Sequence, residues 1–257
     1  MSQNIHYLLW TGGFDSTFRL VELARIGCTV QPLYVESPSR KSRALESSAR
    51  KNILRVLKNH SLNTFILPVE KIPRENIPEN QKITNAFREI RRHHWLGGQY
   101  EYLARLLASR PDLKGTELAV EDLWSNTDHF SRLLREICTL KKSGDAFVID
   151  PKKSTPEGRI IFENFRFGIA TRTEPEMLNL LESWGFSDVL QNIWFCFHPK
   201  KGLPCGLCNP CRVKIESGLA SLLPPAAISR YKKFSHLKKK FGLKFAKKLR
   251  PLLRLFS

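Results

Sequence analysis

The chain has 257 residues, of which 42% are apolar and 10% aromatic, so it can bury the core of one α/β domain and a small appendage. Its formal net charge is +18, and residues 230–257 hold eleven Lys and Arg but no Asp or Glu. No apolar run approaches the roughly 18 residues of a membrane-spanning helix. Residues 1–10 lack the basic and apolar regions of a signal peptide, so we expect a cytoplasmic protein without a transmembrane segment.

Residues 7–19, which read YLLWTGGFDSTFR, predict a strand, a glycine turn and a helix. The adjacent Gly12 and Gly13 permit a close backbone approach and a positive φ. A helix that begins at Phe14 turns its first N–H groups toward the same point, and residues 15–17 could cap it or hold a phosphate and its metal. The turn is therefore either an ordinary strand-to-helix connection or an anion site. It matches neither the GKT loop nor the GxGxxG turn.

Residues 29–36, TVQPLYVE, predict a second strand. The strand–helix–strand order predicts a parallel pair with a right-handed crossover. In open parallel sheets the ligand crevice lies at the carboxyl ends of the strands. We therefore expect residues 11–17 and the backbone at Tyr34 and Val35 at one edge, where this backbone could contact a nucleotide base or simply continue a core strand.

Farther along the chain the pattern predicts a helix over residues 44–58, a strand over 64–69 and a long loop over 70–90. Arg91 and Arg92 are expected to open the next helix, where positive charge opposes the helix dipole and so indicates an anionic ligand. The remaining predicted elements are a strand at 117–120, a helix at 126–142, strands at 146–149 and 160–162, and a helix at 174–184 capped by Thr173.

Four of the six cysteines lie within sixteen residues, in the order Cys196-x8-Cys205-x2-Cys208-x2-Cys211. In a cytosolic chain such clustering indicates a metal rather than disulfides. Four thiolates without a free position predict a closed, structural zinc site, with an iron–sulfur cluster as the alternative. Cys28 and Cys138 are expected to act as small buried hydrophobes.

Together the two motifs resemble those of the 7-cyano-7-deazaguanine synthases, which are PP-loop (N-type) ATP pyrophosphatases of queuosine biosynthesis. LLWTGGFDST is similar to the family's L-S-G-G-x-D-S-T loop, and WFC…PCGLCNPC is similar to its W-S-C-Y…P-C-G-x-C-x-x-C. The likeness extends over residues 5–218. It implies an α/β, Rossmann-like fold of the adenine nucleotide alpha hydrolase type, with a five-stranded parallel sheet flanked by helices and a C-terminal zinc-bound module.

The resemblance implies ATP and Mg²⁺ at residues 11–17 and Zn²⁺ at the four cysteines. It implies an ATP-dependent ligase, in which ATP adenylates the carboxylate of a 7-deazaguanine and ammonia displaces AMP. In nitrile-forming members the amide is then activated by a second ATP and dehydrated. Asp15 and Ser16 are the catalytic candidates. The nucleotide-binding candidates are Leu9, Trp10, Thr11, Gly12, Gly13, Phe14, Asp15, Ser16, Thr17, Tyr34 and Val35.

The substrate-side motifs of the family have weaker counterparts in this chain. Its R-N element is matched best by Arg92-His93, and Glu121-Asp122 stands near the place of its Y-P-D-C-R segment. Arg92 and Asp122 are therefore the candidate substrate contacts. Two alternatives remain open. One is a divergent homologue in an anti-phage defence system that attaches or modifies a deazaguanine on a protein, and the other is a tRNA-modifying PP-loop protein that uses its basic tail.

The C-terminal residues 230–257 predict a basic amphipathic helix that docks on an acidic protein, a nucleic acid or an anionic membrane surface. The alternative is a solvated basic face on a helix packed against the body. The apolar face of the predicted helix is formed by Phe241, Phe245, Leu249, Leu252 and Leu253. We expect the helix to break or end at Pro251. We expect a PP-loop ATP-binding domain over 1–190, a zinc module with its helix over 191–223, and the basic tail over 224–257. We also expect a homodimer or a place in a larger complex.

Overall fold

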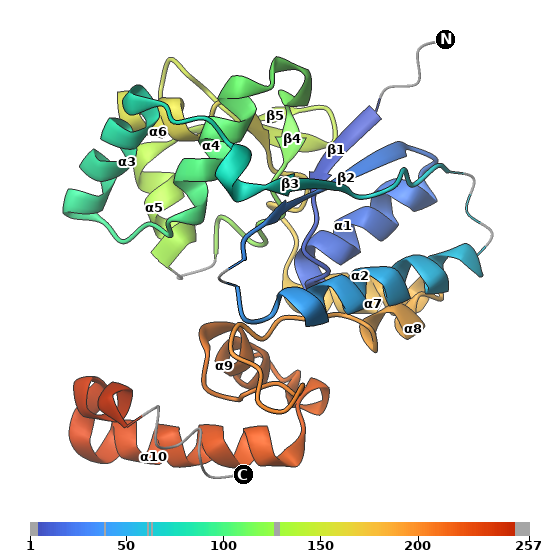
Figure 1. The fold of residues 1–257 in the computed structure, drawn as a ribbon, viewed down its shortest axis with the longest axis vertical. Coiled ribbons are helices and arrows are strands. Elements are labelled where there is room, and N and C mark those ends of the chain that lie inside the picture. Colours follow the sequence, from blue (N-terminus) through green and yellow to red (C-terminus); the bar gives the residue numbers. More distant parts are fainter. Residues whose placement is uncertain (1–4, 39, 61, 63, 126–128, 250–257) are drawn as a thin grey trace. The chain divides into compact units, whose positions relative to one another are not determined.

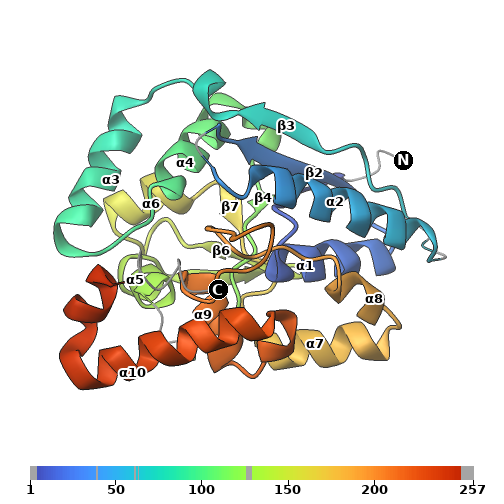
Figure 2. The same cartoon turned by 60° about the horizontal axis from the view of Figure 1, so that its bottom comes forward.

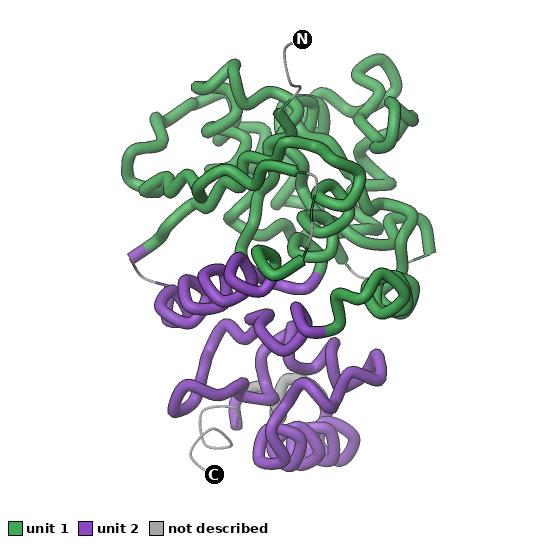
Figure 3. The backbone as a smooth tube through the Cα atoms, turned by 90° about the vertical axis from the view of Figure 1, so that its right-hand side faces the viewer, with its two compact units in different colours: residues 1–11, 15–37, 57–187 green, residues 12–14, 38–56, 188–257 purple. Residues whose placement is uncertain are grey.

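The computed structural model describes residues 5–38, 40–60, 62, 64–125 and 129–249. The chain divides into two compact units (Figure 3). Unit 1 consists of residues 1–11, 15–37 and 57–187, and unit 2 consists of residues 12–14, 38–56 and 188–257. None of the helices in the described ranges has the length and hydropathy needed to cross a membrane.

Unit 1 contains a five-stranded sheet in which every strand pair is parallel, in the order β3-β2-β1-β4-β7 (Figure 1). This confirms the expected five-stranded parallel sheet flanked by helices. The strands are β1 (Ile5–Leu9), β2 (Thr29–Glu36), β3 (Glu70–Pro73), β4 (Thr116–Glu117) and β7 (Phe165–Arg166). Chain order reverses between β1 and β4, and in open parallel sheets such a reversal marks the ligand crevice at the carboxyl ends of the strands.

Helices cover the sheet of unit 1. They are α1 (Phe14–Arg25), α3 (Gln81–His93), α4 (Gln99–Ser109), α5 (His129–Ile137), α6 (Pro156–Phe162) and α7 (Glu174–Ser183). The helices α3, α4, α5 and α6 share one apolar core with β2 and β3. On the other side of the sheet α1 and α7 lie side by side, and the rings of Phe18 and Trp184 stack with centroids 5.6 Å apart (Figures 1 and 2). The predicted cap of α7 is confirmed, because Thr173 forms a capping box with Glu176.

The region between residues 64 and 93 differs most from the sequence prediction. The strand predicted at 64–69 reduces to a single bridge between Ile66 and Val30, and the edge strand β3 follows it. The loop predicted over 70–90 is wrong, because α3 begins at Gln81. Asn80 caps it by accepting a hydrogen bond from the Ile83 N–H. The buried residues of α3 are Ile83, Ala86, Phe87 and Ile90, which follow the helical period.

This correction reverses the dipole argument for Arg91 and Arg92. Both residues lie in the last turn of α3, and the next helix, α4, begins only at Gln99. Positive charge is favourable at a helix C-terminus. The position of these two arginines along the chain is therefore no evidence of an anionic ligand.

Two further predictions in the second half of unit 1 are wrong. The helix predicted over 126–142 ends at Ile137, and residues 126–128 lie outside the described residues. The following residues form a hairpin of β5 (Leu140–Ser143) and β6 (Ala146–Ile149), the second of which confirms the strand predicted there. The strand predicted at 160–162 is part of α6, which starts with Thr155 as cap and Pro156 in its first turn.

Unit 2 holds most of α2 (Arg43–Lys58), together with α9 (Asn209–Glu216) and α10 (Pro225–Lys248). Four short elements complete the chain, namely α8 (Ser187–Leu190) and the 3-10 helices η1 (Arg74–Asn76), η2 (Pro111–Leu113) and η3 (Ala220–Leu222). The helix predicted for the tail is present up to Lys248, but it has a kink that the sequence does not predict. Gly242 is non-helical (φ 81°, ψ 164°) and divides α10, so the helical spacing is broken directly after Phe241. Pro251, Leu252 and Leu253 lie outside the described residues.

Candidate metal centre and nucleotide loop

The four clustered cysteines of unit 2 converge on one point. The side chains of Cys196, Cys205, Cys208 and Cys211 are all buried, and their sulfur atoms all lie within 4.8 Å of one another. The Sγ atoms of Cys208 and Cys211 are 3.4 Å apart, and those of Cys208 and Cys196 are 3.9 Å apart. A tetrahedral ion with metal–sulfur bonds of about 2.3 Å places its ligands about 3.8 Å apart. The cluster therefore could hold a zinc ion.

Backbone N–H groups point at two of these sulfur atoms. The Cys205 N–H donates to Cys196 Sγ (3.2 Å), and the N–H groups of Leu207 and Cys208 donate to Cys205 Sγ (3.4 and 3.3 Å). Hydrogen bonds from the other three thiols, together with the Leu207 N–H, lower the pKa of Cys205. Hydrogen bonds with Cys196, Cys205 and Cys208 raise the pKa of Cys211. Four thiolates cannot share this small volume without a cation. The donor set thus fits a metal ion.

The loop that carries the second and third cysteines needs a glycine between them. Gly206 has φ +75°, and a Cβ at this position would lie 2.0 Å from the Ala227 carbonyl oxygen. The buried Arg230 donates from Nε to the Cys205 carbonyl (2.9 Å) and from Nη2 to the Pro204 carbonyl (3.3 Å). The first part of α10 is therefore a structural support of the cysteine cluster, although its sequence lies partly in the predicted basic tail.

The glycine turn follows the central strand of the sheet. The strand β1 ends at Leu9, the Trp10 N–H donates to the Leu33 carbonyl (2.8 Å), and α1 begins at Phe14. Gly12 has φ +82°, so the predicted strand, glycine turn and helix are present. Asp15, Ser16 and Thr17 occupy the first turn of α1, where backbone N–H groups point toward the start of the helix. Thr17 Oγ1 accepts the Trp10 indole N–H (3.0 Å).

Within unit 2, two buried cationic side chains lie against residues 12–14. A Cβ on Gly12 would lie 3.1 Å from Arg50 Cγ, and Lys214 Nζ lies 4.5 Å from the centroid of the Phe14 ring. Arg50 is 3% and Lys214 is 6% exposed. The Trp194 N–H donates to the Gly12 carbonyl (2.8 Å), which ties this turn to the chain just before the first cysteine. Arg50 and Lys214 therefore place positive charge beside the turn.

A buried ion pair holds α1 against the sheet of unit 1. Arg19 donates from Nε and Nη2 to the two carboxylate oxygens of Glu117 (2.6 and 2.9 Å), and also to Asp145 (2.6 Å). Burial works to raise the pKa of the Glu117 carboxyl, but hydrogen bonds from His6 and Arg19 outweigh it and bring that pKa below its usual range. A Cβ on Gly168 would come within 2.4 Å of this pair, so the glycine leaves room for it.

Tyr34 and Val35 lie near the carboxyl end of β2, and both side chains are buried. Val35 belongs to the apolar core. The Leu33 carbonyl accepts a hydrogen bond from Trp10, so the peptide groups of Leu33 point toward β1. Alternate residues of a strand turn their peptide groups to the same side, so those of Val35 point the same way. They lie beyond Leu9, the last residue of β1 that pairs with β2. The Val35 side chain is thus part of the core, and contact between its backbone and a nucleotide stays a prediction.

The two predicted substrate contacts take up different places in unit 1. Asp122 follows β4, has φ 43°, and accepts hydrogen bonds from the N–H (3.2 Å) and hydroxyl of Ser125. Arg92 pairs with Glu89 and lines a pocket on α3, and the described lining of that pocket contains neither Asp122 nor any residue of the glycine turn. Asp122 therefore follows a strand that borders the reversal of the sheet, whereas Arg92 belongs to a separate feature.

The two remaining cysteines differ in burial. Cys138 is buried, and burial raises the pKa of its thiol to about 12, which agrees with the predicted inert core role. Cys28 is only partly buried. Sequence reasoning missed Arg19, Arg50, Lys214 and Arg230, because a buried arginine or lysine has no spacing signal that separates it from the many exposed ones.

No model of a known protein family matches this chain, and a search of curated proteins finds no relative of it. Function is therefore inferred from the residues of the glycine turn and the metal centre.

Proposed function

We propose that the chain is an ATP-dependent ligase that adenylates a carboxylate at the glycine turn. The observation that carries this proposal is the place of the turn. It leaves the central strand β1 beside the reversal of strand order and opens directly into α1. Such a position is where open parallel sheets bind nucleotides, and the N–H groups of a helix start suit a phosphate.

Charge around the turn supports a phosphate ligand rather than a neutral one. Within unit 2, Arg50 and Lys214 are buried beside residues 12–14, where they add positive charge to the electrostatic field around this segment. In the proposed reaction the first N–H groups of α1 bind the β- and γ-phosphates. They stabilise the negative charge that develops on pyrophosphate as it leaves.

The chemistry requires no covalent bond to the protein. The substrate carboxylate attacks the α-phosphorus of ATP, the bond to the bridging oxygen breaks, and pyrophosphate leaves. Ammonia then attacks the acyl adenylate, so that AMP leaves with one carboxylate oxygen and an amide remains. In this scheme Asp15 offers carboxylate oxygens to Mg²⁺, and Ser16 hydrogen-bonds a phosphate. The resemblance assigns the carboxylate to a 7-deazaguanine, and a nitrile requires a second round of activation by ATP.

The four cysteines are proposed to hold Zn²⁺ in a structural role. Four thiolates leave no open position for substrate on the ion. Zinc would supply the positive charge that lets the four thiolates share this volume. A single ion fits the compact cluster better than an iron–sulfur cluster, which is larger and needs its cysteines farther apart.

The proposal is tested by incubating the purified chain with ATP, Mg²⁺, ammonia and 7-carboxy-7-deazaguanine and measuring nucleotides and products by mass spectrometry. We expect AMP and pyrophosphate in equal amounts, with an amide or a nitrile. Asp15→Ala should lose at least about a hundredfold in rate, as for removal of other charge-stabilising groups, whereas Asp112→Ala, on an exposed ion pair, should keep full rate. A mass increase on a protein instead of a small product would favour the alternative in which the enzyme attaches a deazaguanine to a protein. Turnover unaffected by Asp15→Ala would overturn the proposal.

A further inference from the structure

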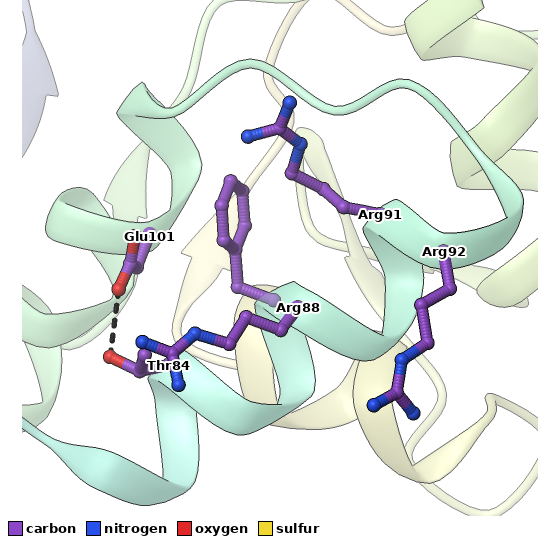
Figure 4. Close-up of a pocket in the computed structure, with 6 residues that line it drawn as sticks. Thr84, Arg88, Arg91, Arg92 and Glu101 are labelled. Carbon is purple, nitrogen blue, oxygen red and sulfur yellow. Dashed lines mark hydrogen bonds between the residues drawn. The ribbon is translucent and has the colours of Figure 1, made fainter.

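A groove in unit 1 is lined mainly by one face of α3 and the first turn of α4. Its volume is about 540 Å³, and it is lined by Thr84, Phe87, Arg88, Arg91, Arg92 and Glu101. In Figure 4 the side chains of Arg88 and Arg91 extend toward the side on which Glu101 lies, and Arg92 extends the other way. The groove is distinct from the glycine turn and does not depend on the proposed ligase activity.

The charge of this groove is strongly positive. Arg92 pairs with Glu89, and the Glu101 carboxylate accepts a hydrogen bond from the Thr84 hydroxyl (2.7 Å). Among the described residues no carboxylate lies within ion-pair distance of Arg88 or Arg91. The Arg91 guanidinium instead lies 5.7 Å from the centroid of the Phe87 ring. Two guanidinium groups therefore face the groove without an ion-pair partner among the described residues, although the Glu101 carboxylate also lines it.

A structural role accounts for only part of this arrangement. Basic residues in the last turn of a helix interact favourably with the dipole, which explains Arg92 and His93. Arg88 lies a full turn earlier, where this effect has faded. All three arginines are exposed, so they do not serve the core.

The geometry suits a chain of phosphates better than a single anion. Arg88 and Arg91, whose guanidinium groups face the groove, are three residues apart and therefore about 4.5 Å apart along the helix axis. Guanidinium groups bind phosphates through two parallel hydrogen bonds. Trp95 is 65% exposed and lies two residues after the end of α3, where its indole offers a surface on which a base can stack.

We propose that the groove along α3, with Trp95, binds single-stranded nucleic acid. Arg88 and Arg91 contact successive phosphates, and Trp95 stacks on a base. An acidic peptide would satisfy the charge but would gain nothing specific from an exposed indole, so nucleic acid is the occupant that uses the whole surface.

The test measures fluorescence anisotropy of a labelled oligouridylate of about 12 nucleotides with the full chain over a range of salt concentrations. R88A/R91A should weaken binding at least about tenfold at low salt and reduce the salt slope by about 1.4, which is about 0.7 per lost phosphate contact. Trp95→Ala should weaken binding about tenfold with little change in the salt slope, because stacking is not ionic.

The matched control is K141A/K142A, which removes the same charge from two exposed lysines of β5 in the same unit. It should weaken binding less than twofold. Equal losses in the two double variants, or failure of the wild type to bind the oligonucleotide at low salt, would overturn the proposal. So would displacement of the oligonucleotide by polyglutamate at an equal concentration of charge, because the groove would then prefer an acidic peptide.

Discussion

Unit 1 buries large apolar side chains over a sheet and several helices, whereas half of the eight residues in the buried cluster of unit 2 are cysteines. The first core gains free energy from water exclusion alone. The second gathers four sulfur atoms within 4.8 Å, and these four residues could hold a metal ion, which would compensate the charge of their thiolates.

A buried arginine has a different kind of partner in each unit. In unit 1 Arg19 and Glu117 compensate each other, so the protein itself supplies both charges. In unit 2 the buried Arg230 donates to two backbone carbonyls of the cysteine loop, and the charge of the thiolates is the part that we propose a zinc ion to compensate. The comparison predicts that unit 2 depends on metal and that unit 1 does not.

Removal of the metal should give the largest difference between the units. Structural zinc contributes about 10–16 kcal/mol in zinc-finger peptides at pH 7, so a strong chelator should unfold the cysteine cluster. Hydrogen exchange should then accelerate in α9 and the start of α10 but stay slow in α3 and α6. Elemental analysis should find one zinc per chain before chelation.

Two cysteine variants provide the matched comparison. Cys211→Ser should abolish stoichiometric zinc binding, whereas Cys138→Ser, at a buried thiol of unit 1, should leave it intact. A Cys211→Ser protein with full zinc content and unchanged exchange would show that the four thiols do not form the metal centre.

The second effect concerns the ion pair of unit 1. Arg19→Met leaves the Glu117 carboxylate buried without its partner, and we expect a loss of about 3–5 kcal/mol in the free energy of unfolding. Arg110→Met removes an exposed pair with Asp112 and should cost less than about 1 kcal/mol. Urea unfolding followed by circular dichroism measures both. Similar losses in the two variants would contradict a buried, mutually compensating pair.

A smaller effect is expected from the glycine of the cysteine loop. Gly206→Ala adds strain at a positive φ and a clash with the Ala227 carbonyl, for a cost of about 2–4 kcal/mol. Gly202→Ala has a similar φ of +76° but no atom within 4 Å of the new Cβ, so it should cost about 1 kcal/mol. Thermal unfolding of the zinc-loaded chain would separate the two, and equal shifts would argue against close packing at Gly206.

Acid should weaken unit 1 through Glu117 and Asp145. Arg19 contributes to a lowered pKa in both carboxyls, against the opposing effect of burial. A lowered folded-state pKa gives stability that is complete above the usual carboxyl pKa of about 4 and is lost as the pH falls through the lowered value. Unfolding free energy measured between pH 6 and pH 2 should therefore fall mainly below about pH 4. Glu117→Gln should flatten this fall, and an unchanged slope would contradict the assignment.

The parts of the fold that the sequence predicts well are those in which one signal dominates. Residues 29–36 form a strand because they are apolar on both faces, and Thr173 with Glu176 marks a helix start. The cysteine spacing predicts the metal centre, because short CxxC steps can converge only on a small volume.

The errors arise where tertiary packing decides between two local patterns. The four buried residues of α3 follow the helical period, but most of its other residues are polar or charged. The sequence pattern therefore predicts a loop there and places the arginines at the start of the next helix, whereas they end α3. Residues 160–162 are apolar enough for a strand, and Thr155 with Pro156 is the signal that makes them a helix. The partner of Arg19 is 98 residues away, so no local pattern could predict this ion pair.

The most direct test of the proposed chemistry follows one oxygen atom. The chain is incubated with ATP, ammonia and 7-carboxy-7-deazaguanine labelled with ¹⁸O in its carboxylate, and the AMP is analysed by mass spectrometry. Adenylation of the carboxylate predicts that each AMP released in the first activation carries one ¹⁸O atom and that Asp15→Ala abolishes the labelled AMP. Unlabelled AMP, or ADP with inorganic phosphate in place of AMP and pyrophosphate, would contradict the account.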